Sequence, residues 1–497
     1  MSRLHRLSSG RLAGLLATGV VALSALASGQ PGHSQPARGQ PVPQDTGRVE
    51  TPASALAFAP FARRAGDRLV IAHYFPSFSV VGGTMGPNGD YYDQQFLKTS
   101  GENFKYRAGR GYIRERPMIP AGGVANDDAG WSVDVARAAR IGIDAFGIDL
   151  LDLDGRHWHS AMGVMQAAER CGCGFKVAPE PDMMTLQTIP ADRLVQALLT
   201  FAKSPAGLRL GDGRLVVIPF AAEQVAPDYW QAVIAGMAQA GQPIALIPDY
   251  VNQRNAAALA RLTWAGARWG SRDTGAGHTQ NDLATSLRTT TQPRWLATLA
   301  PQDMRPKGLT FNEAQGSGAL ASAFDAAMAG HAQGLHLVTW NDYSEGSELE
   351  PSTATHHAYY DLLAWYIAWF KGGRPPAIAR DGFVVFQRNQ VFNPQDSSRG
   401  DPWHNVGAAP LANVVNVVLW LRAPTDVTVA VGGNNRTFHL PAGFQSVNVP
   451  AAVGAVSVRL QRGTQVVAQC QSPIAIAATA DRHDPLYGGF SSLRGCN

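Results

Sequence analysis

The chain has 497 residues, 45% of them hydrophobic and 16% charged, which is long enough for more than one domain and apolar enough for a large core. This balance excludes a chain that is disordered over most of its length. The formal net charge is +4, but no lysine-rich stretch with interleaved aromatic residues occurs, which argues against nucleic acid as a partner.

The N-terminus predicts export. Several arginines precede an apolar stretch over residues 12–26, and Ala25-Leu26-Ala27 has the small-x-small pattern of a cleavage site. An uncleaved membrane anchor is the alternative, but a spanning helix needs ~20 apolar residues and this stretch is shorter. We therefore predict a signal peptide over residues 1–27, a secreted or periplasmic protein, and no membrane contact after cleavage.

Residues 28–67 are rich in Pro, Gly, Gln, Ser and Ala, and this composition predicts a flexible linker. Folded structure is expected from residue 68 onward. The linker would separate the signal peptide from the first domain.

The four cysteines form two couples along the chain. Cys470 and Cys496 could close a loop near the C-terminus of an exported protein, whereas Cys171 and Cys173 are too close for easy direct pairing. No histidine pair stands at ligand spacing beside either couple, so the sequence indicates no zinc site there. We expect no metal and no other cofactor.

After the linker, short apolar runs alternate with helical patterns. Eight runs are predicted strands: 69–75, 143–149, 175–178, 215–220, 244–248, 265–269, 295–299 and 335–340. Apolar residues at three- and four-residue spacing predict helices over 131–140, 192–202, 229–240, 319–332 and 359–370. The alternation favours an α/β fold, a (β/α)8 TIM barrel over residues 68–376. The alternative is an open doubly wound sheet, but the glycine-rich phosphate loop typical of that fold does not follow the first strand.

Two further segments are distinct in composition. Residues 79–130, rich in Gly, Asn, Asp and Tyr, follow the first strand, and we expect them to wall a cleft at the catalytic face of the barrel. Beyond residue 376, short β-rich runs predict a small C-terminal β-sandwich over residues 377–497. Carbohydrate binding and packing support for the barrel are both open as its role.

Polar and aromatic side chains at the carboxyl ends of the predicted barrel strands are expected to face one site. The candidates are His73, Tyr74, Asp149, Asp152, Glu180, Asp182, Asp249, Trp269, Trp340, Asn341, Asp342, Tyr343 and Glu345. Each loop aspartate has an alternative role as a cap of the next helix. The aromatic residues could stack on sugar rings or simply pack in the core.

Asp342 and Glu345 are the strongest candidates, because two carboxylates three residues apart after a tight strand can be held at different pKa values. One would then act as general acid and the other as general base, as in sugar-cleaving enzymes. The alternative is a solvated acidic loop that also contains Glu348 and Glu350. Motifs of serine hydrolases, P-loop proteins and zinc proteases do not occur in the sequence.

The segment Trp340-Asn-Asp-Tyr-Ser-Glu345 resembles the Trp-Asn-Asp-Tyr-Gly-Glu signature of glycoside hydrolase family 71, the endo-α-1,3-glucanases or mutanases. His73-Tyr-Phe-Pro76 and the acidic run up to Pro351 are closer to the related family 99 endo-α-mannosidases. The resemblance covers roughly residues 68–376. It implies that Asp342 and Glu345 form the catalytic pair and that Asp149 is an important third acid.

These observations predict an exported hydrolase, monomeric and without a cofactor, that cleaves an α-linked polysaccharide or oligosaccharide. α-1,3-Glucan is the first expected substrate and α-mannoside the alternative. Glu345 is the expected general acid and Asp342 the general base, while Asp149 positions substrate or water. A noncatalytic polysaccharide-binding or export protein is the alternative of a different class.

Overall fold

The computed structural model describes residues 56–61, 68–80, 115–120, 122–252, 256–270, 272–277, 282–284, 294–396, 402–479 and 483–496. The predicted signal peptide lies outside these residues, as do most of the predicted linker and most of the insertion after the first strand. Among the helices that are described, none is both long enough and apolar enough to cross a membrane.

The helices that were predicted from apolar spacing are all present. The described helices are α1 (Asp127–Arg140), α2 (Arg156–Arg170), α3 (Ala191–Lys203), η4 (Ala222–Gln224), α4 (Pro227–Gln239), α5 (Ala256–Leu259), α7 (Gly318–Ala329), α8 (Ala358–Gly372) and η5 (Ser492–Arg494). Helix α1 starts where the Asn126 side chain accepts a hydrogen bond from the backbone N–H of Ala129, at 3.0 Å. Helix α2 was not predicted, and much of its buried face consists of small residues.

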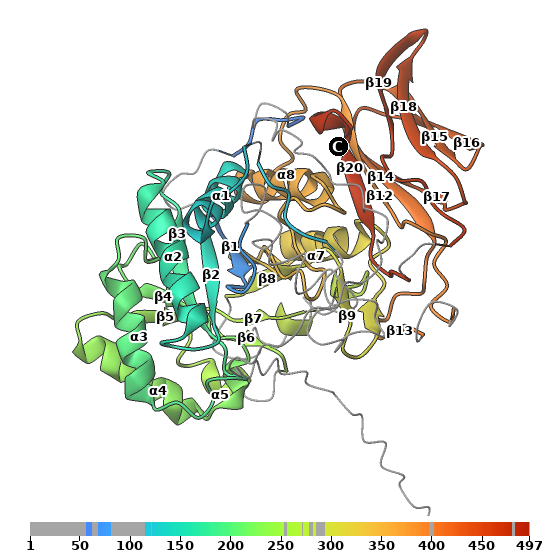
Figure 1. Ribbon diagram of the computed structural model, residues 1–497. Helices are drawn as coiled ribbons and strands as arrows, with labels where there is room; N and C mark the ends of the chain where they lie inside the picture. Colours follow the sequence, from blue (N-terminus) through green and yellow to red (C-terminus); the bar gives the residue numbers. More distant parts are fainter. Residues whose placement is uncertain are drawn as a thin grey trace, which may run out of the picture. The chain divides into compact units, whose positions relative to one another are not determined.

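The strands of the N-terminal half are parallel and alternate with helices (Figure 1). They are β1 (Leu69–Tyr74), β2 (Ala145–Leu150), β3 (Lys176–Pro181), β4 (Leu215–Val217), β5 (Ile244–Leu246), β6 (Asp249–Tyr250), β7 (Ala267–Arg268), β8 (Leu296–Leu299) and β11 (Gly334–Leu337). Five pair in the order β3-β2-β1-β11-β8, while β4 pairs with β5 and β6 with β7. Near-continuous apolar runs suit this arrangement, because helices cover parallel strands.

The three parallel sheets are linked by single parallel bridges rather than by continuous ladders. Phe220 bridges Asp182 after β3 and also Asp249 at the start of β6. Gly266 bridges Trp295 and so joins the β6–β7 pair to β8. The hydrogen-bonded ladders of the described residues therefore do not form one closed sheet, although every link between them is parallel.

The C-terminal region is antiparallel, as its short β-rich runs predicted. Its strands are β12 (Gly382–Gln387), β13 (His404–Asn405), β14 (Val414–Leu421), β15 (Thr425–Val431), β16 (Asn434–Leu440), β17 (Gly443–Pro450), β18 (Val456–Arg462), β19 (Gln465–Gln471) and β20 (Gly488–Ser491). Two four-stranded sheets result, in the orders β17-β14-β12-β20 and β16-β15-β18-β19. Strand β13 instead joins β9 (Asp303–Arg305) and β10 (Thr310–Asn312), a small sheet beside the parallel strands.

Helix α8 connects the parallel strands to the antiparallel region, and it is buried on nearly all sides. Its Trp365 packs against Trp420 of β14 and against Phe58, with ring centroids 6.1 and 5.1 Å apart. Phe58 also forms an antiparallel bridge with Ile378. Residues 56–58 are buried although they belong to the predicted linker, so a flexible tether is the wrong description of this segment.

Both cysteine couples form disulfides. The Cys470–Cys496 pair joins β19 to the C-terminus, as the sequence suggested. The expectation that Cys171 and Cys173 are too close to pair was wrong, since they form a disulfide with a Cα–Cα distance of 5.2 Å. Gly172 and Gly174 have φ values of +60° and +76°, a backbone conformation that glycine adopts easily and that permits the tight turn.

Candidate active site

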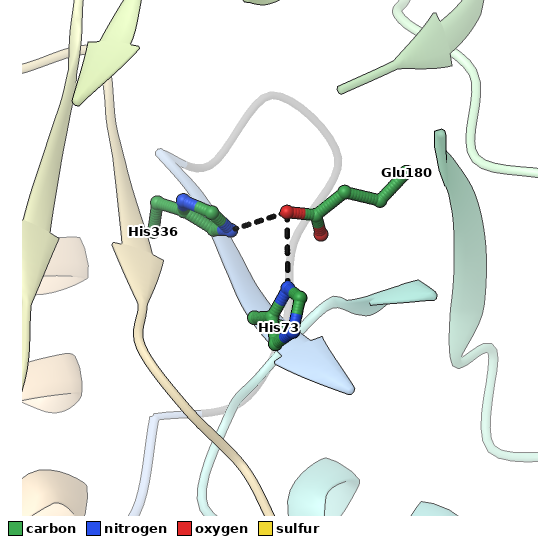
Figure 2. Close-up of side chains that lie close together, drawn as sticks. All are labelled: His73, Glu180 and His336. Atoms are coloured by element: carbon green, nitrogen blue, oxygen red, sulfur yellow. Dashed lines mark ion pairs between the residues drawn. The ribbon is translucent and has the colours of Figure 1, made fainter. Parts of the chain in front are cut away.

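The ends of the parallel strands bring a cluster of buried ionisable side chains together, as the sequence predicted for several of them. Glu180 of β3 lies between two histidines, with its Oε1 at 3.0 Å from Nδ1 of His73 and at 3.7 Å from Nε2 of His336 (Figure 2). Asp249 lies on the other side of His336, with Oδ2 at 3.5 Å from Nδ1. Asp149 Oδ2 is 4.0 Å from Nε2 of His73.

These groups shift one another's protonation. Burial raises the pKa of Glu180, but the positive charges of His73 and His336 outweigh burial and lower the pKa to about 2. Burial raises the pKa of Asp249 to about 7. Burial and then the neighbouring acids Asp182 and Glu180 raise the pKa of Asp149 well above its usual range. The cluster therefore contains both an ionised carboxylate and carboxyls that retain a proton.

The segment after β11 folds into a compact loop around Asp342. Its Oδ1 accepts hydrogen bonds from the backbone N–H of Ser344 at 2.9 Å, from the Ser344 hydroxyl at 2.5 Å and from the backbone N–H of Glu345 at 3.2 Å. The backbone N–H of Asp342 in turn donates to the Thr339 hydroxyl at 2.8 Å. These bonds fix the orientation of the carboxylate, which is 6% exposed.

Glu345 lies beside two arginines that the sequence analysis did not single out. Arg305 donates to both carboxylate oxygens, with Nη1–Oε1 at 3.0 Å and Nη2–Oε2 at 3.1 Å, and Arg272 Nη2 lies 3.4 Å from Oε2. The buried Asp303 holds the same two arginines. Burial raises the pKa of Glu345, and the two arginines lower it without offsetting the effect of burial.

The remaining acids of this loop are not a solvated surface, which was the alternative interpretation. Glu348 and Glu350 are each 1% exposed. Glu350 accepts from Arg137 of α1 at 2.6 Å, and Glu348 lies beside Glu115. Burial, followed by the neighbouring acid, raises the pKa of Glu348 well above its usual range.

The described part of the predicted insertion packs on this same loop. The backbone N–H of Met118 donates to the carbonyl of Pro351 at 2.8 Å, and Pro117 forms an antiparallel bridge with Ser352. Glu115 accepts a hydrogen bond from the Ser352 hydroxyl. The stretch predicted to wall the cleft thus supports the loop that carries Asp342 and Glu345, as far as its described residues extend.

Four of the candidate residues do not face the strand-end cluster. Tyr74 and Trp340 both point to Asp134 of α1 and donate to its carboxylate at 2.8 and 3.1 Å. Tyr343 donates to Glu350 and is fully buried. The expectation that Tyr74, Trp340 and Tyr343 contact substrate is corrected, since each has no more than 1% of its surface exposed and lies in the core.

Asn341 has a structural role as well. Its amide donates to the carbonyls of Phe75 and Phe78, at 3.0 and 2.6 Å, and its oxygen accepts from the backbone N–H of Phe75. This side chain therefore fastens the loop after β1 to the loop after β11. It is fully buried, which corrects the expectation of substrate contact.

Two of the loop aspartates take the capping and turn roles that were left open. Asp152 accepts from the backbone N–H groups of Gly155, His157 and Trp158 at the start of α2. Asp182 accepts from Met184 and Thr185, and burial raises its pKa to about 6. Asp152 is thus a helix cap, while Asp182 remains near Asp149.

Trp269 lies at the cluster as predicted. Its ring meets the His73 ring edge-on, with centroids 4.9 Å apart, and the Arg272 guanidinium lies 5.0 Å from its centroid. The ring is partly exposed. An aromatic face beside carboxylates is the arrangement that sugar-binding sites use.

His336, Arg272 and Arg305 were missed by the sequence analysis. His336 stands inside an apolar strand, and a polar residue in such a run is the signal that could have identified it. The two arginines follow short or irregular segments, and their pairing with Glu345 joins positions 40 or more residues apart. No local pattern encodes that contact.

Two sequence comparisons identify the family and a similar protein. The sequence model described as glycosyl hydrolase family 71 matches residues 122–484. A mutanase of Penicillium rubens is 23% identical over 375 residues, which cover 70% of this chain and 81% of the mutanase.

The solved structures that match this chain have low identity and TM-scores below 0.5. A family 99 endo-α-mannosidase from Bacteroides thetaiotaomicron is 11% identical, covers 62% of this chain and 98% of its own, and has a TM-score of 0.47. A structure described as a glycoside hydrolase-like protein is 16% identical, covers 64% of this chain and 97% of its own, and has a TM-score of 0.43.

Proposed function

The chain belongs to glycosyl hydrolase family 71 and is a glycoside hydrolase, and on this premise we propose that it cleaves α-1,3-glucan. The observation that carries the proposal is the loop after β11, where Asp342 and Glu345 lie in distinct electrostatic surroundings. Glycoside hydrolysis needs such a division between two carboxyl groups. The similarity to a mutanase supports an α-glucan as the substrate.

Glu345 is the proposed general acid. Burial raises its pKa, so the carboxyl keeps a proton to higher pH than an exposed glutamate and can deliver it to the leaving oxygen. Arg305 and Arg272 then stabilise the carboxylate that remains after proton transfer. The pair of arginines thus assists the acid after it has reacted.

Asp342 is the proposed general base. Three hydrogen bonds to Oδ1 hold the carboxylate in place, and the other oxygen, Oδ2, is proposed to accept from a water molecule or a sugar hydroxyl. Asp149, whose pKa is raised by burial and neighbouring acids, is proposed to position substrate or water between the two strand ends. Trp269 is proposed to support a sugar ring beside them.

The test is the release of reducing ends by the purified protein from α-1,3-glucan, α-mannan, dextran and starch. Release from α-1,3-glucan, reduced by about 100-fold or more in Glu345→Gln, is the expected result. Glu169→Gln on helix α2 is the matched control, because this glutamate bonds only Ser204 at the helix surface and its variant should keep full activity.

Two other outcomes would change the proposal. Release from α-mannan alone would keep the hydrolase and replace the substrate. Retention of the protein on a polymer, with no reducing ends released from any of them, would favour the noncatalytic binding protein instead.

We also propose that the parallel strands form one (β/α)8 barrel and that the two antiparallel sheets form a β-sandwich. The parallel bridges at Phe220 and Gly266 support the barrel, since they link the separate ladders in chain order. The sandwich is supported by one apolar cluster that draws side chains from both sheets, including Val417 of β14 and Val429 of β15. The domain boundary is proposed at residue 376, and the mature chain is proposed to be an exported monomer.

A further inference from the structure

We propose that His73, Glu180 and His336 bind a divalent transition metal of the Zn²⁺ class inside the ring of parallel strands. The three residues come from β1, β3 and β11, and their side chains converge on one point (Figure 2). Each offers a ligand atom, and these atoms lie within 4.8 Å of one another. Nothing in the glycosidase chemistry proposed above requires this ion.

Two of the three separations between ligand atoms are close to those around a tetrahedral ion. Two ligand atoms that are each about 2.1 Å from a tetrahedral centre lie about 3.4 Å apart. Glu180 Oε1 is 3.0 Å from Nδ1 of His73 and 3.7 Å from Nε2 of His336, values on either side of that separation. Three protein ligands leave a fourth position for water.

The polar atoms of the cluster lack hydrogen bonds. Both oxygens of Glu180, both ring nitrogens of His336 and Nδ1 of His73 are buried without a hydrogen-bond partner among the described residues. Nδ1 of His73 and Oε1 of Glu180 are close enough for a hydrogen bond but do not meet at a suitable angle. Buried polar groups in native structures are nearly always paired, so this set of orphaned atoms indicates a ligand.

Two carboxylates lie next to the histidines. The ring nitrogen of His336 that faces away from Glu180 lies 3.5 Å from Asp249, and the corresponding nitrogen of His73 lies 4.0 Å from Asp149. Metal-binding histidines characteristically direct their second nitrogen to a carboxylate, which fixes the tautomer. At these distances neither pair forms a hydrogen bond, and we expect Asp249 and Asp149 to accept from these nitrogens once the ion is bound.

A glycine makes room for the proposed ligand. A Cβ atom at Gly147 of β2 would lie 2.4 Å from Oε2 of Glu180, so any other residue there would displace the carboxylate. The Trp269 ring lies against both histidines, with ring centroids 4.9 Å from His73 and 6.5 Å from His336.

An ion-pair network without metal is the competing explanation. It requires a proton on each histidine and hydrogen bonds that compensate the buried charges. Those bonds are not formed, whereas a metal ion needs no such protons and uses the same atoms as ligands. Two imidazole nitrogens and one carboxylate favour Zn²⁺, Co²⁺ or Ni²⁺ over Ca²⁺ and Mg²⁺, which prefer sets of oxygen ligands.

The experiment is equilibrium dialysis of the purified protein, first against a chelator and then against Zn²⁺, with the bound metal measured by mass spectrometry. One equivalent per chain is expected, with Glu180→Gln weakening the affinity by about 100-fold and Asp249→Asn by about 10-fold. His439→Ala is the matched control, because this exposed histidine pairs only with Asp426 on the antiparallel sheet. Its variant should bind like the wild type.

Circular dichroism establishes that each variant is folded. If Glu180→Gln does not fold, the visible absorption spectrum of the wild-type protein loaded with Co²⁺ tests the proposal. A four-coordinate site of nitrogen and oxygen ligands gives strong visible absorption, whereas Co²⁺ bound loosely at the surface does not. Absence of a bound equivalent in the wild type would overturn the proposal. Equal binding by Glu180→Gln and His439→Ala would overturn it as well.

Discussion

At the scale of single residues, Glu345 experiences opposing influences that set its protonation. Burial raises the pKa of its carboxyl, while Arg305 at 3.0 Å and Arg272 at 3.4 Å lower it. The guanidinium of Arg305 is 44% exposed, so solvent screens part of its effect. The pH at which Glu345 loses its proton, and with it the activity, should therefore depend on Arg305.

Loss of Arg305 is expected to move the alkaline limb of the activity profile upward. A general acid works only while protonated, so activity falls as the pH rises through the pKa of Glu345. Arg305→Gln removes a charge that lowers this pKa, so the midpoint should move to higher pH. The measurement is kcat as a function of pH.

A surface arginine provides the comparison. Arg193 pairs with the exposed Asp154, and Arg193→Gln should leave the profile unchanged. A downward shift in Arg305→Gln would contradict the role of Glu345 as the acid, because it would mean that the limb reports another group.

For single residues, the sequence predicted the site only in part. His73 and Tyr74 were both predicted at the site, but successive side chains of a strand point to opposite faces, so only one of them could face the cluster. His73 does, and Tyr74 packs against α1. The position of Asp342 followed from its strand, whereas its contacts with Ser344 depend on loop conformation that no periodicity encodes.

At the scale of elements, Asp134 joins helix α1 to the end of strand β1 and to the loop after β11. Its carboxylate accepts from the Tyr74 hydroxyl and from the Trp340 indole N–H, and it is fully buried. Burial raises its pKa to about 6. One acidic side chain thus satisfies two buried donors from segments more than 200 residues apart in the sequence.

Asp134→Ala is expected to lower the free energy of unfolding by about 3 kcal/mol. Both donors would lose their partner inside the core, and each unsatisfied buried group costs about 1–3 kcal/mol. Urea denaturation measures the change. Asp228→Ala, at the exposed start of α4, should change stability little, and an equal loss in the two variants would show that Asp134 has no special role.

The strands themselves were largely predictable, because long apolar runs bounded by polar residues locate buried strands. The run over 69–75 begins with β1 and ends one residue beyond it. The small strand pair β9–β10 was missed, since most residues of these two short strands are polar. Which strands pair depends on contacts between distant residues, so sequence pattern could only suggest the barrel.

At the scale of the whole molecule, a buried ion pair connects the parallel half to the antiparallel half. Arg388, just after β12, donates to Glu313 at 2.8 Å, and its guanidinium lies 4.2 Å from the centroid of the Tyr487 ring. The Tyr487 hydroxyl donates to the other oxygen of Glu313. Glu313 thus joins the two halves.

Arg388→Met is expected to destabilise the protein by about 4 kcal/mol, because it leaves the Glu313 carboxylate buried with no cation beside it. Thermal and urea unfolding would both record the loss. Arg214→Met breaks an ion pair with Asp212 at the surface and should leave the unfolding midpoint unchanged. Unfolding of Arg388→Met at the wild-type midpoint would mean that this ion pair does not hold the halves together.

The final position of helix α8 depends on residues that are synthesised last. Its buried Asp361 accepts from Ser491 and Arg494, each at 2.8 Å, and both belong to the last described residues. While the ribosome is still adding the final strands, this carboxylate has no counterpart and the helix cannot settle into its final place. Maturation of the hydrolase is therefore expected to wait for the complete polypeptide, and nascent chains that stop short of Ser491 should be the ones that chaperones and proteases capture.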